Sequence, residues 1–517
     1  MRVDSKESDM SLNIIWEKGR KLATFRLIHL DIRYPINDVP HANLVLAGKE
    51  VSMLSLSSDA ESDLQMMVPG KSVSIQTGKE TLFSGNIVEQ QVQFAQGERT
   101  VVLTVCHATQ MLKTNYRSQI FTEQSDSDVF ALLLQNFSAK IEEMRFKHPQ
   151  LIQFSCSDWQ FLKARLQACG LWLVVTPKAV SVMKPALKTS AEVVITPHVS
   201  RSIEILRNNS LLPERLDVSS WDIKQQEMRA ASPAAAPALA EASLSSAGMA
   251  TSTKREWHHG YSLSLEEDEQ RAFADSRMQL NHISSLHASI ILTGDAGYVP
   301  GQTLELKGFG KGIDGKALVT AVCHTFQPGD WTTTLEVGAD LTGIFHGEML
   351  PGVNGLHIGI VEEDKTQADD DGIHYLAVSM PALCLGKQTI NARLSSPFAS
   401  NGRGLTFWPR KGDEVVLGFF ENDPRFPVIV GAMHSPKNKL PDTAFSDGIG
   451  LVLQDGQLNQ QLVLYPQKGI LQEVAKGDVK SSLQLQEGKA MLFTEDALNI
   501  EGKKSVTIKG AKVDLNQ

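Results

Sequence analysis

The sequence predicts a mainly β protein with a small α/β insertion, and three patterns support this. Short strand-like segments punctuated by Gly and Pro run through most of the 517 residues. Only two segments show a helical pattern of apolar residues, and both lie near residue 150. Toward the C-terminus, apolar residues recur in regularly spaced pairs, as in strands with one apolar face. A chain of this length exceeds a single core, so we expect about three to four domains.

The composition is that of an ordinary globular protein, with 42% hydrophobic and 21% charged residues. The formal net charge of −9 argues against a nucleic acid or an anionic membrane as partner, because either favours a basic surface. Residues 1–30 show no signal sequence, and no apolar run reaches membrane-spanning length, which predicts synthesis in the cytoplasm. No C-x-x-C pair occurs, so we expect buried thiols rather than a zinc site or disulfides at Cys106, Cys156, Cys169, Cys323 and Cys384.

The α/β insertion is expected at about residues 116–215. One helix is predicted at about 128–140, and a second at about 158–169. The second helix begins with a capping box formed by Ser157 and Gln160 and ends at Gly170. Residues 230–252 form an Ala/Ser/Pro tract with almost no large apolar side chain, from which we expect a mobile linker.

An internal repeat relates residues 68–105 to residues 299–337. Both segments begin with Val-Pro-Gly and continue with strand-like alternation. Five later positions of the first segment, Phe94, Gly97, Thr100, Leu103 and Val105, recur with identical offsets as Phe326, Gly329, Thr332, Leu335 and Val337. This agreement indicates a duplicated β-unit. Such a duplication is the plan of a ring component that presents the same surface twice in each chain.

Residues 352–441 predict a small Greek-key barrel of OB type. The expected strands are 356–362, 373–380, 404–408, 413–420 and 426–430. The acidic residues 369–371 fall in the first loop, where we expect a solvated turn rather than a metal site.

Residues 448–517 predict a needle. Apolar pairs recur every seven or eight residues, and a strand of that length cannot bury a single apolar face within its own chain. We therefore expect three chains to wind into a triple-stranded β-helix, with an irregular β-meander as the alternative. The expected core positions of the trimeric needle are Leu483, Leu485, Met491, Phe493, Leu498, Ile500, Val506, Ile508, Val513 and Leu515.

No motif for enzymatic chemistry is evident, so we expect no catalytic residue, cofactor or metal. His258 and His259 are adjacent and lack a helical H-x-x-x-H partner, so a solvated loop is expected there. The glycine-rich residues 308–315 are expected to form a hairpin loop. The alternative class is a β-helical, tailspike-like glycan hydrolase, which would require paired carboxylates in a groove.

These pieces, in this order, resemble the VgrG-type spike family of contractile injection systems, whose architecture is shared with the hub and spike of contractile-tailed phages. The resemblance is carried by S-P-x-A-x-x-G-x-G, P-x-x-G-D-E-V and D-P-R-x-P-V-x-x-G runs. The matching residues are Pro397, Gly402, Gly404, Pro409, Gly412, Asp413, Glu414, Asp423, Pro424, Arg425, Pro427 and Gly431. Arg410 and Lys411 depart from the acidic residue that many relatives carry after the proline, which puts the surface of that loop in doubt.

The resemblance implies a hub domain of residues 1–345 that carries two tube-like β-barrels, expected at about 20–115 and 260–345. It also implies a non-enzymatic homotrimeric spike that adapts a threefold needle to a sixfold tube and punctures a membrane. It implies tube-initiating and baseplate proteins at the hub, a PAAR-type tip protein, possible effector cargo for toxin delivery, and a membrane partner only during puncture. The short needle and the absence of an appended lysozyme or toxin domain look more like an extracellular injection particle of antifeeding-prophage type than type VI secretion. Such a particle would be assembled in the cytoplasm.

Overall fold

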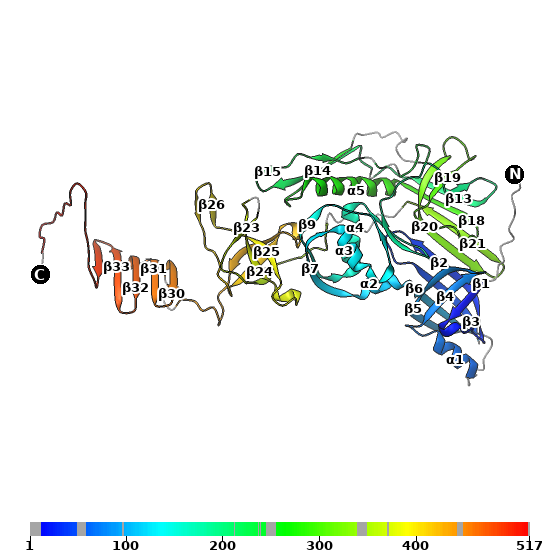
Figure 1. Cartoon of the computed structure of the whole chain (residues 1–517), viewed down its shortest axis with the longest axis horizontal. Helices are drawn as coiled ribbons and strands as arrows, with labels where there is room; N and C mark the ends of the chain where they lie inside the picture. The colour runs from blue at the N-terminus through cyan, green and yellow to red at the C-terminus, as the bar shows by residue number, and fades with distance from the viewer. Residues whose placement is uncertain are drawn as a thin grey trace. The chain divides into compact units, whose positions relative to one another are not determined.

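The computed structural model describes residues 12–48, 58–95, 98–210, 212–235, 237, 239–244, 255–338, 349–369, 372–441 and 448–514. The chain divides into two compact units, Met1–Ala432 and Met433–Gln517. Strands outnumber helices in both units (Figure 1), which confirms the predicted mainly β class. No helix among the described residues is both long enough and apolar enough to span a membrane.

A large sheet, twelve-stranded within the described residues, is built from strands between residues 12 and 337 of the N-terminal unit (Figure 1). Its first part has the order β1-β4-β5-β6-β3-β2, with bounds Leu12–Trp16, Ser72–Thr77, Glu80–Ala95, Glu98–Cys106, His41–Gly48 and Phe25–Pro35. Its second part has the order β12-β19-β20-β21-β18-β13, with bounds Val193–Ile195, Thr303–Leu306, Gly315–Gln327, Asp330–Val337, Leu286–Thr293 and Ser200–Arg207. The two parts share one apolar core.

The two parts repeat one strand order. The antiparallel series β4-β5-β6-β3-β2 corresponds to β19-β20-β21-β18-β13. In the paired hairpins, Phe94 lies opposite Arg99 and Phe326 lies opposite Trp331. Each hairpin also shifts register seven residues before the phenylalanine, after Ile87 and after Val319. Pairing of β2 with β20 joins the parts into one sheet, so two separate closed barrels stay a prediction.

The α/β insertion contains the two helices expected from the sequence. Helix α4, Asp158–Cys169, has the predicted capping box of Ser157 and Gln160, and Gly170 ends it with a φ of 67°. Helix α3, Asp126–Leu133, is shorter than predicted; a 3-10 turn follows, and Ser138 then adopts a left-handed φ of 46°. The helices pack against β7 and β9, Tyr116–Ser125 and Lys147–Ser157. Strands β10, β11 and β8 form a small adjoining sheet, Trp172–Val175, Val180–Met183 and Lys140–Ile141.

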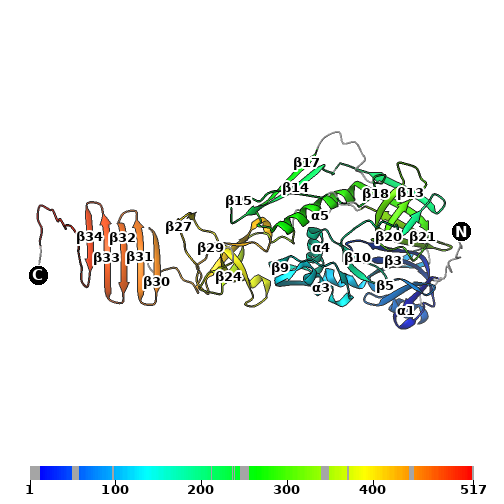
Figure 2. The same ribbon diagram turned by 45° about the horizontal axis from the view of Figure 1, so that its top comes forward.

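Three further helices of the described residues were not predicted: α1, Ser58–Met66, the one-turn α2, Met111–Thr114, and the longer α5, Glu267–Ser285. Figures 1 and 2 show α5 lying along β14, Arg215–Asp222. Phe273 and Met278 of α5 share a small core with Leu216 and Val218 of β14. The first turn of α5 is acidic and the helix has few apolar residues, so the sequence shows only a weak helical pattern.

Two expectations about this region were wrong. His258 and His259 lie in strand β17, Glu256–Tyr261, which pairs in parallel with β14, rather than in a solvated loop. The tract 230–252 is not a mobile linker over its described residues. Leu239 and Leu244 are buried, and Ala240 forms a β-bridge with Ala317. Two leucines are thus enough to hold a segment that composition alone predicts to be unpacked.

Other predicted loops occur where expected. Residues 307–314 connect β19 to β20, and the Asp314 carboxylate accepts N–H groups from Gly308, Phe309 and Gly310. In the acidic loop, Asp369 Oδ1 accepts the N–H of Ile373 at 2.8 Å, whereas residues 370 and 371 lie outside the described residues.

The OB-type barrel is confirmed. The strands pair in a closed cycle, β22-β28-β29-β25-β24 and back to β22, and only β25 and β29 run in parallel. Their bounds are His357–Val361, Glu414–Phe419, Pro427–Ala432, Thr389–Leu394 and His374–Ser379. Strand β25 was missed in the sequence. Of the segment expected as strand 404–408, only residues 404 and 405 are in a strand, and they belong to a separate hairpin of β26 and β27, Phe398–Ser400 and Arg403–Leu405.

The C-terminal unit contains an antiparallel meander of β30 to β34, Ile449–Asp455, Leu458–Tyr465, Gly469–Lys476, Val479–Gln486 and Lys489–Thr494. In register, Leu483 and Leu485 lie opposite Leu492 and Ala490. Met491 and Phe493 therefore lie on the other face, so the expected alignment of these two pairs on one face was wrong. The cause is that the two-residue turn before β34 shifts the alternation by one position.

Residues 495–514 carry no strand in this structure, although the sequence predicted strands there. Within this segment Leu498, Ile500, Val506, Ile508 and Val513 are each at least half exposed. Leu515 lies outside the described residues. A core role for these residues in a trimer stays a prediction.

We call the twelve-stranded sheet the hub sheet. A buried histidine makes its stability depend on pH. His324 is 2% exposed, its Nδ1 lies 3.0 Å from Thr333 Oγ1, and burial lowers its pKa to about 4. Between pH 6.5 and 4 the unfolded chain therefore binds more protons than the folded chain, and stability falls as pH falls. At about 1.4 kcal/mol per pKa unit, the loss is on the order of 3 kcal/mol.

We expect His324→Gln to weaken this dependence, since a neutral amide can keep a hydrogen bond to Thr333 without taking up a proton. Melting temperatures of both proteins at pH 7 and pH 4.5 test it. Equal decreases in the two proteins would contradict the assignment, because groups common to both would then account for the whole effect.

Candidate functional site

A buried charged joint connects the OB barrel to the hub. Arg425 is 6% exposed, and its Nε and Nη2 donate to both carboxylate oxygens of Asp423. Its Nη1 donates to Glu269 Oε1 of α5 at 2.5 Å, and its Nη2 lies 3.3 Å from the Met349 sulfur. The D-P-R run of the barrel therefore reaches a helix more than 150 positions earlier in the chain.

The same joint continues into the α/β insertion. Arg165 of α4 is 1% exposed, donates Nε and Nη2 to the Asp126 carboxylate, and lies 3.6 Å from Glu269. His148 Nε2 lies 2.8 Å from Asp126 Oδ2. We call Asp126, His148, Arg165, Glu269, Asp423 and Arg425 the charged joint. Because Glu269 contacts both arginines, the joint links α4, α5 and the barrel in one network.

The electrostatics of the charged joint favour its ionised form. Burial alone would raise the pKa of Asp126, but Arg165 and His148 hold it well below its usual range. Burial opposes the charge on Arg425, and Asp423 and Glu269 more than offset it, so its pKa lies above the ordinary value. Each buried charge has a partner of opposite sign with good geometry, the condition under which buried ions are tolerated. Such paired groups are suited to holding domains together.

A second contact supports the same junction. Gln150 of β9 donates Nε2 to the carbonyl oxygen of Arg425 at 2.8 Å. Its Oε1 accepts the N–H of Asn391 in β25 at 3.0 Å. The barrel is thus attached to the hub through backbone groups as well as through charges.

The structure separates the predicted motif residues of the barrel by role. Asp423 and Arg425 belong to the charged joint, whereas Gly402 and Gly412 adopt left-handed φ values of 67° and 89° at turns. Asp413 Oδ2 accepts the N–H of Arg410 in the turn before β28. Pro397 directly precedes β26, and Glu414 and Pro427 begin β28 and β29. Gly404 and Gly431 lie within β27 and β29, and Pro409 and Pro424 lie in the connections between strands. The sequence revealed the motif but not its partner, because Glu269 carries no local signal.

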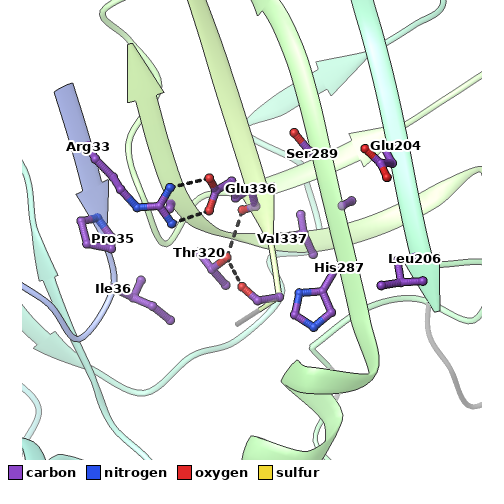
Figure 3. Close-up of a pocket in the computed structure, with 13 residues that line it drawn as sticks. Arg33, Pro35, Ile36, Glu204, Leu206, His287, Ser289, Thr320, Glu336 and Val337 are labelled. Atoms are coloured by element: carbon purple, nitrogen blue, oxygen red, sulfur yellow. Dashed lines mark hydrogen bonds and ion pairs between the residues drawn. The ribbon is translucent and has the colours of Figure 1, made fainter. Parts of the chain in front are cut away.

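The hub sheet carries a cavity of about 540 Å³ between β2, β13, β18, β20 and β21 (Figure 3). Arg33 points at Glu336 and donates two hydrogen bonds to it, at 2.5 and 2.6 Å. Thr320, at the register shift of β20, donates to the carbonyl oxygens of Glu336 and Gly338. The principal cation of the cavity is already paired with a carboxylate, and the described lining residues bring no nucleophile together with a base.

The described residues show neither a cluster of metal ligands nor a thiol with a lowered pKa. No group of three or more His, Cys, Asp or Glu side chains among them could hold a metal ion. The five cysteines are unpaired, as expected, and burial raises the pKa of Cys323 to about 12. The expectation that all of them are buried holds fully for Cys156 alone. Cys106, Cys169 and Cys323 are partly buried, and Cys384 is exposed beside the 3-10 turn of the barrel.

The meander of β30 to β34, which we call the needle sheet, has one apolar face that no other described residue of its own unit covers. In register, this face carries Ile449, Leu451, Leu453, Leu462, Leu464, Ile470, Val474, Leu483, Leu485 and Leu492. Their exposed fractions run from 37% for Leu483 to 77% for Ile449. The opposite face includes the hydrogen bond from Gln461 to Glu473 and the ion pair of Glu473 with Lys480. We call the first set the open needle face.

Two family models match the chain. One, described as the Alg8 N-terminal domain, matches residues 7–328, which is more than half of the chain. The other, described as the type VI secretion system/phage-baseplate injector OB domain, matches residues 357–434. A comparison with curated proteins found no significant match.

Solved structures share the fold at low sequence identity. The E. coli c3393 protein, described as a type VI secretion component with structural similarity to T4 bacteriophage tail proteins gp27 and gp5, is 13% identical. That match covers 82% of this chain and 100% of the other, with a TM-score of 0.50. A chain of the half-lidded Francisella PdpA-VgrG complex is 10% identical, with coverage of 94% and 88% and a TM-score of 0.58. The fold is therefore that of VgrG-type and phage-tail proteins.

The charged joint predicts a large effect of one substitution. Arg425→Met leaves Asp423 and Glu269 buried without their shared cation, and breaking a buried ion pair in this way costs about 3–5 kcal/mol. We expect a clear decrease in melting temperature and earlier cleavage between barrel and hub in limited proteolysis.

Arg410→Met is the matched control, since the Arg410 side chain is exposed on the same barrel. A surface change of this kind alters stability by roughly 0.5 kcal/mol or less. Equal melting curves and equal proteolysis for the two variants would refute a structural role for the joint.

Proposed function

The chain belongs to the family of the Alg8 N-terminal domain and carries an injector OB domain, and from this premise we propose that it is the trimeric central spike and hub of a contractile injection machine. The observation that carries this proposal is the repeated strand order of the hub sheet. Three chains with two equivalent parts each supply six similar units. A threefold spike could then cap a sixfold tube without a separate adaptor.

The open needle face supports the trimer. Large apolar faces on single sheets are rare in monomers, because each exposed aliphatic side chain forgoes about 1.5–3 kcal/mol of burial. Three copies packed with these faces inward would bury them around one axis. On this proposal the side chains of Met491 and Phe493 face away from the trimer axis. Residues 498–515 continue the needle as the triple-stranded β-helix expected from the sequence.

The finer roles follow from the same proposal. The hub would contact tube-initiating and baseplate proteins, and the needle end would receive a PAAR-type tip protein. Puncture of a target membrane, possible effector cargo and the antifeeding-prophage type of particle, assembled in the cytoplasm, are further parts of it. The Francisella match is to a VgrG complex with PdpA, which supports a spike that carries other proteins.

We also propose that the chain acts without catalysis. The buried carboxylates of the charged joint are neutralised by Arg165 and Arg425. A glycan hydrolase would instead need two carboxylates in a groove, one of which can hold a proton.

One pair of substitutions tests the trimer through the open needle face. Leu485→Asp would bury three carboxylates together in the trimer, and an unpaired buried charge costs several kcal/mol per ion. We expect a shift from trimer to monomer by native mass spectrometry of the full chain. Gln486→Asp, at the next position and on the other face, should leave the trimer intact.

Because the two residues are neighbours in β33, the comparison tests which face of the sheet a residue lies on and not its place along the strand. A parent protein that is monomeric at all concentrations would refute the proposed function. A trimer that both variants preserve would refute the inward orientation of this face.

A further inference from the structure

The two equivalent parts of the hub sheet differ in strand direction at one end, where β1 is antiparallel to β4 and β12 is parallel to β19, and in the pairing of their other edges. The N-terminal half of β20 pairs with β19, and its C-terminal half pairs with β2 on the same side. The corresponding strand β5 pairs with β4 over its N-terminal half, but residues 89–95 have no strand on that side within the described part of the chain. At the far end of the sheet, β13 pairs with β18 alone among described strands. Besides the outer sides of the short strands β1 and β12, the described part of the sheet therefore has two unpaired edges, at residues 89–95 and at β13.

Exposure of equivalent residues points to the same place. Phe326 is 8% exposed and stacks on Trp331, whereas its counterpart Phe94 is 61% exposed. In β2, Leu30 and Ile32 are fully buried. Their counterparts in β13 are only half-buried, and Leu206 of the same strand is 58% exposed. The apolar side chains covered at the joint within the chain are thus uncovered at the two free edges.

The pairings fix which residues correspond. Leu30 lies opposite Leu44, which lies opposite Leu103. Leu103 corresponds in the repeat to Leu335, which lies opposite Ile290, and Ile290 lies opposite Ile203. Ile203 therefore occupies the position of Leu30, and Ile205 that of Ile32. Within the chain, Leu30 pairs with Phe326 and Ile32 with His324.

We propose that β13 of one copy pairs antiparallel with residues 89–94 of β5 in a second copy, in the register of the β2–β20 joint. Ile203 then lies opposite Phe94, Ile205 opposite Val92 and Leu206 opposite Gln91. This inference rests on the proposed trimeric hub and gives its contact between chains. Repeated three times, the contact closes the sheet and leaves neither edge free, the usual solution for exposed edges.

The side chains on the other face fit this register. Within the chain, Thr325 Oγ1 donates to Asp31 Oδ1 at 2.7 Å across the β2–β20 joint. The equivalent pair between copies is Gln93 and Glu204, an amide donor opposite a carboxylate acceptor. Both are exposed in the single chain, so each is free to meet a partner chain. A second copy is the occupant because one chain carries both halves of the contact.

Cysteine pairs test the register. Opposite residues of an antiparallel pair have Cα atoms about 4.5–5.5 Å apart, within disulfide range, whereas a shift of two residues gives about 7–8 Å. We expect Glu204→Cys with Gln93→Cys, and Leu206→Cys with Gln91→Cys, to shift the band to three times the chain mass on oxidation. The crossed pairs, Glu204→Cys with Gln91→Cys and Leu206→Cys with Gln93→Cys, should lose most of that product.

Each single cysteine variant serves as a control for pairing with the exposed Cys384. Native mass spectrometry of the same samples separates the two proposals. A trimer in which neither in-register pair cross-links, or in which the crossed pairs cross-link as well, overturns this contact and leaves the spike in place. A protein that does not form trimers overturns both.

Discussion

The pairing of β2 with β20 is the contact on which the hub depends. It joins two parts of identical strand order into one continuous sheet, so that one chain presents the same unit twice. An open sheet with unpaired edges invites further pairing. A second copy can therefore pair with a free edge in the way that one part of the sheet pairs with the other. On the proposed function, three such chains supply six similar units without an additional domain.

The charged joint performs the corresponding task between hub and barrel. Its members come from α3, β9, α4, α5 and the loop before β29, and they are buried with their charges paired. A paired buried network adds little net stability compared with an apolar contact, but it defines one geometry, since a displaced arginine would leave two carboxylates unpaired. If the chain acts as the proposed spike, a fixed junction of this kind would keep the parts of its N-terminal unit in one arrangement under load.

Much of this could be predicted from the sequence where the signal is local. The capping box of α4, the hairpins of the repeat and the Gly-Asp-Glu turn of the barrel are set by neighbouring residues, and they were found. The partners of Arg425 could not be, because Glu269 lies in an acidic helix whose apolar face is only weakly marked. Leu239 and Leu244 were missed for a related reason, since their burial depends on distant strands. The face of the sheet on which Met491 lies depends on the length of the turn before β34. The spacing of the apolar pairs does not determine that length.

The central claim, three chains giving six equivalent units, is tested most directly by electron microscopy of the purified full-length protein viewed along its axis. The account predicts particles whose hub shows six lobes of similar density, with threefold symmetry when the images are averaged without imposed symmetry. Single chains, a twofold particle, or a threefold ring with only three lobes would contradict it.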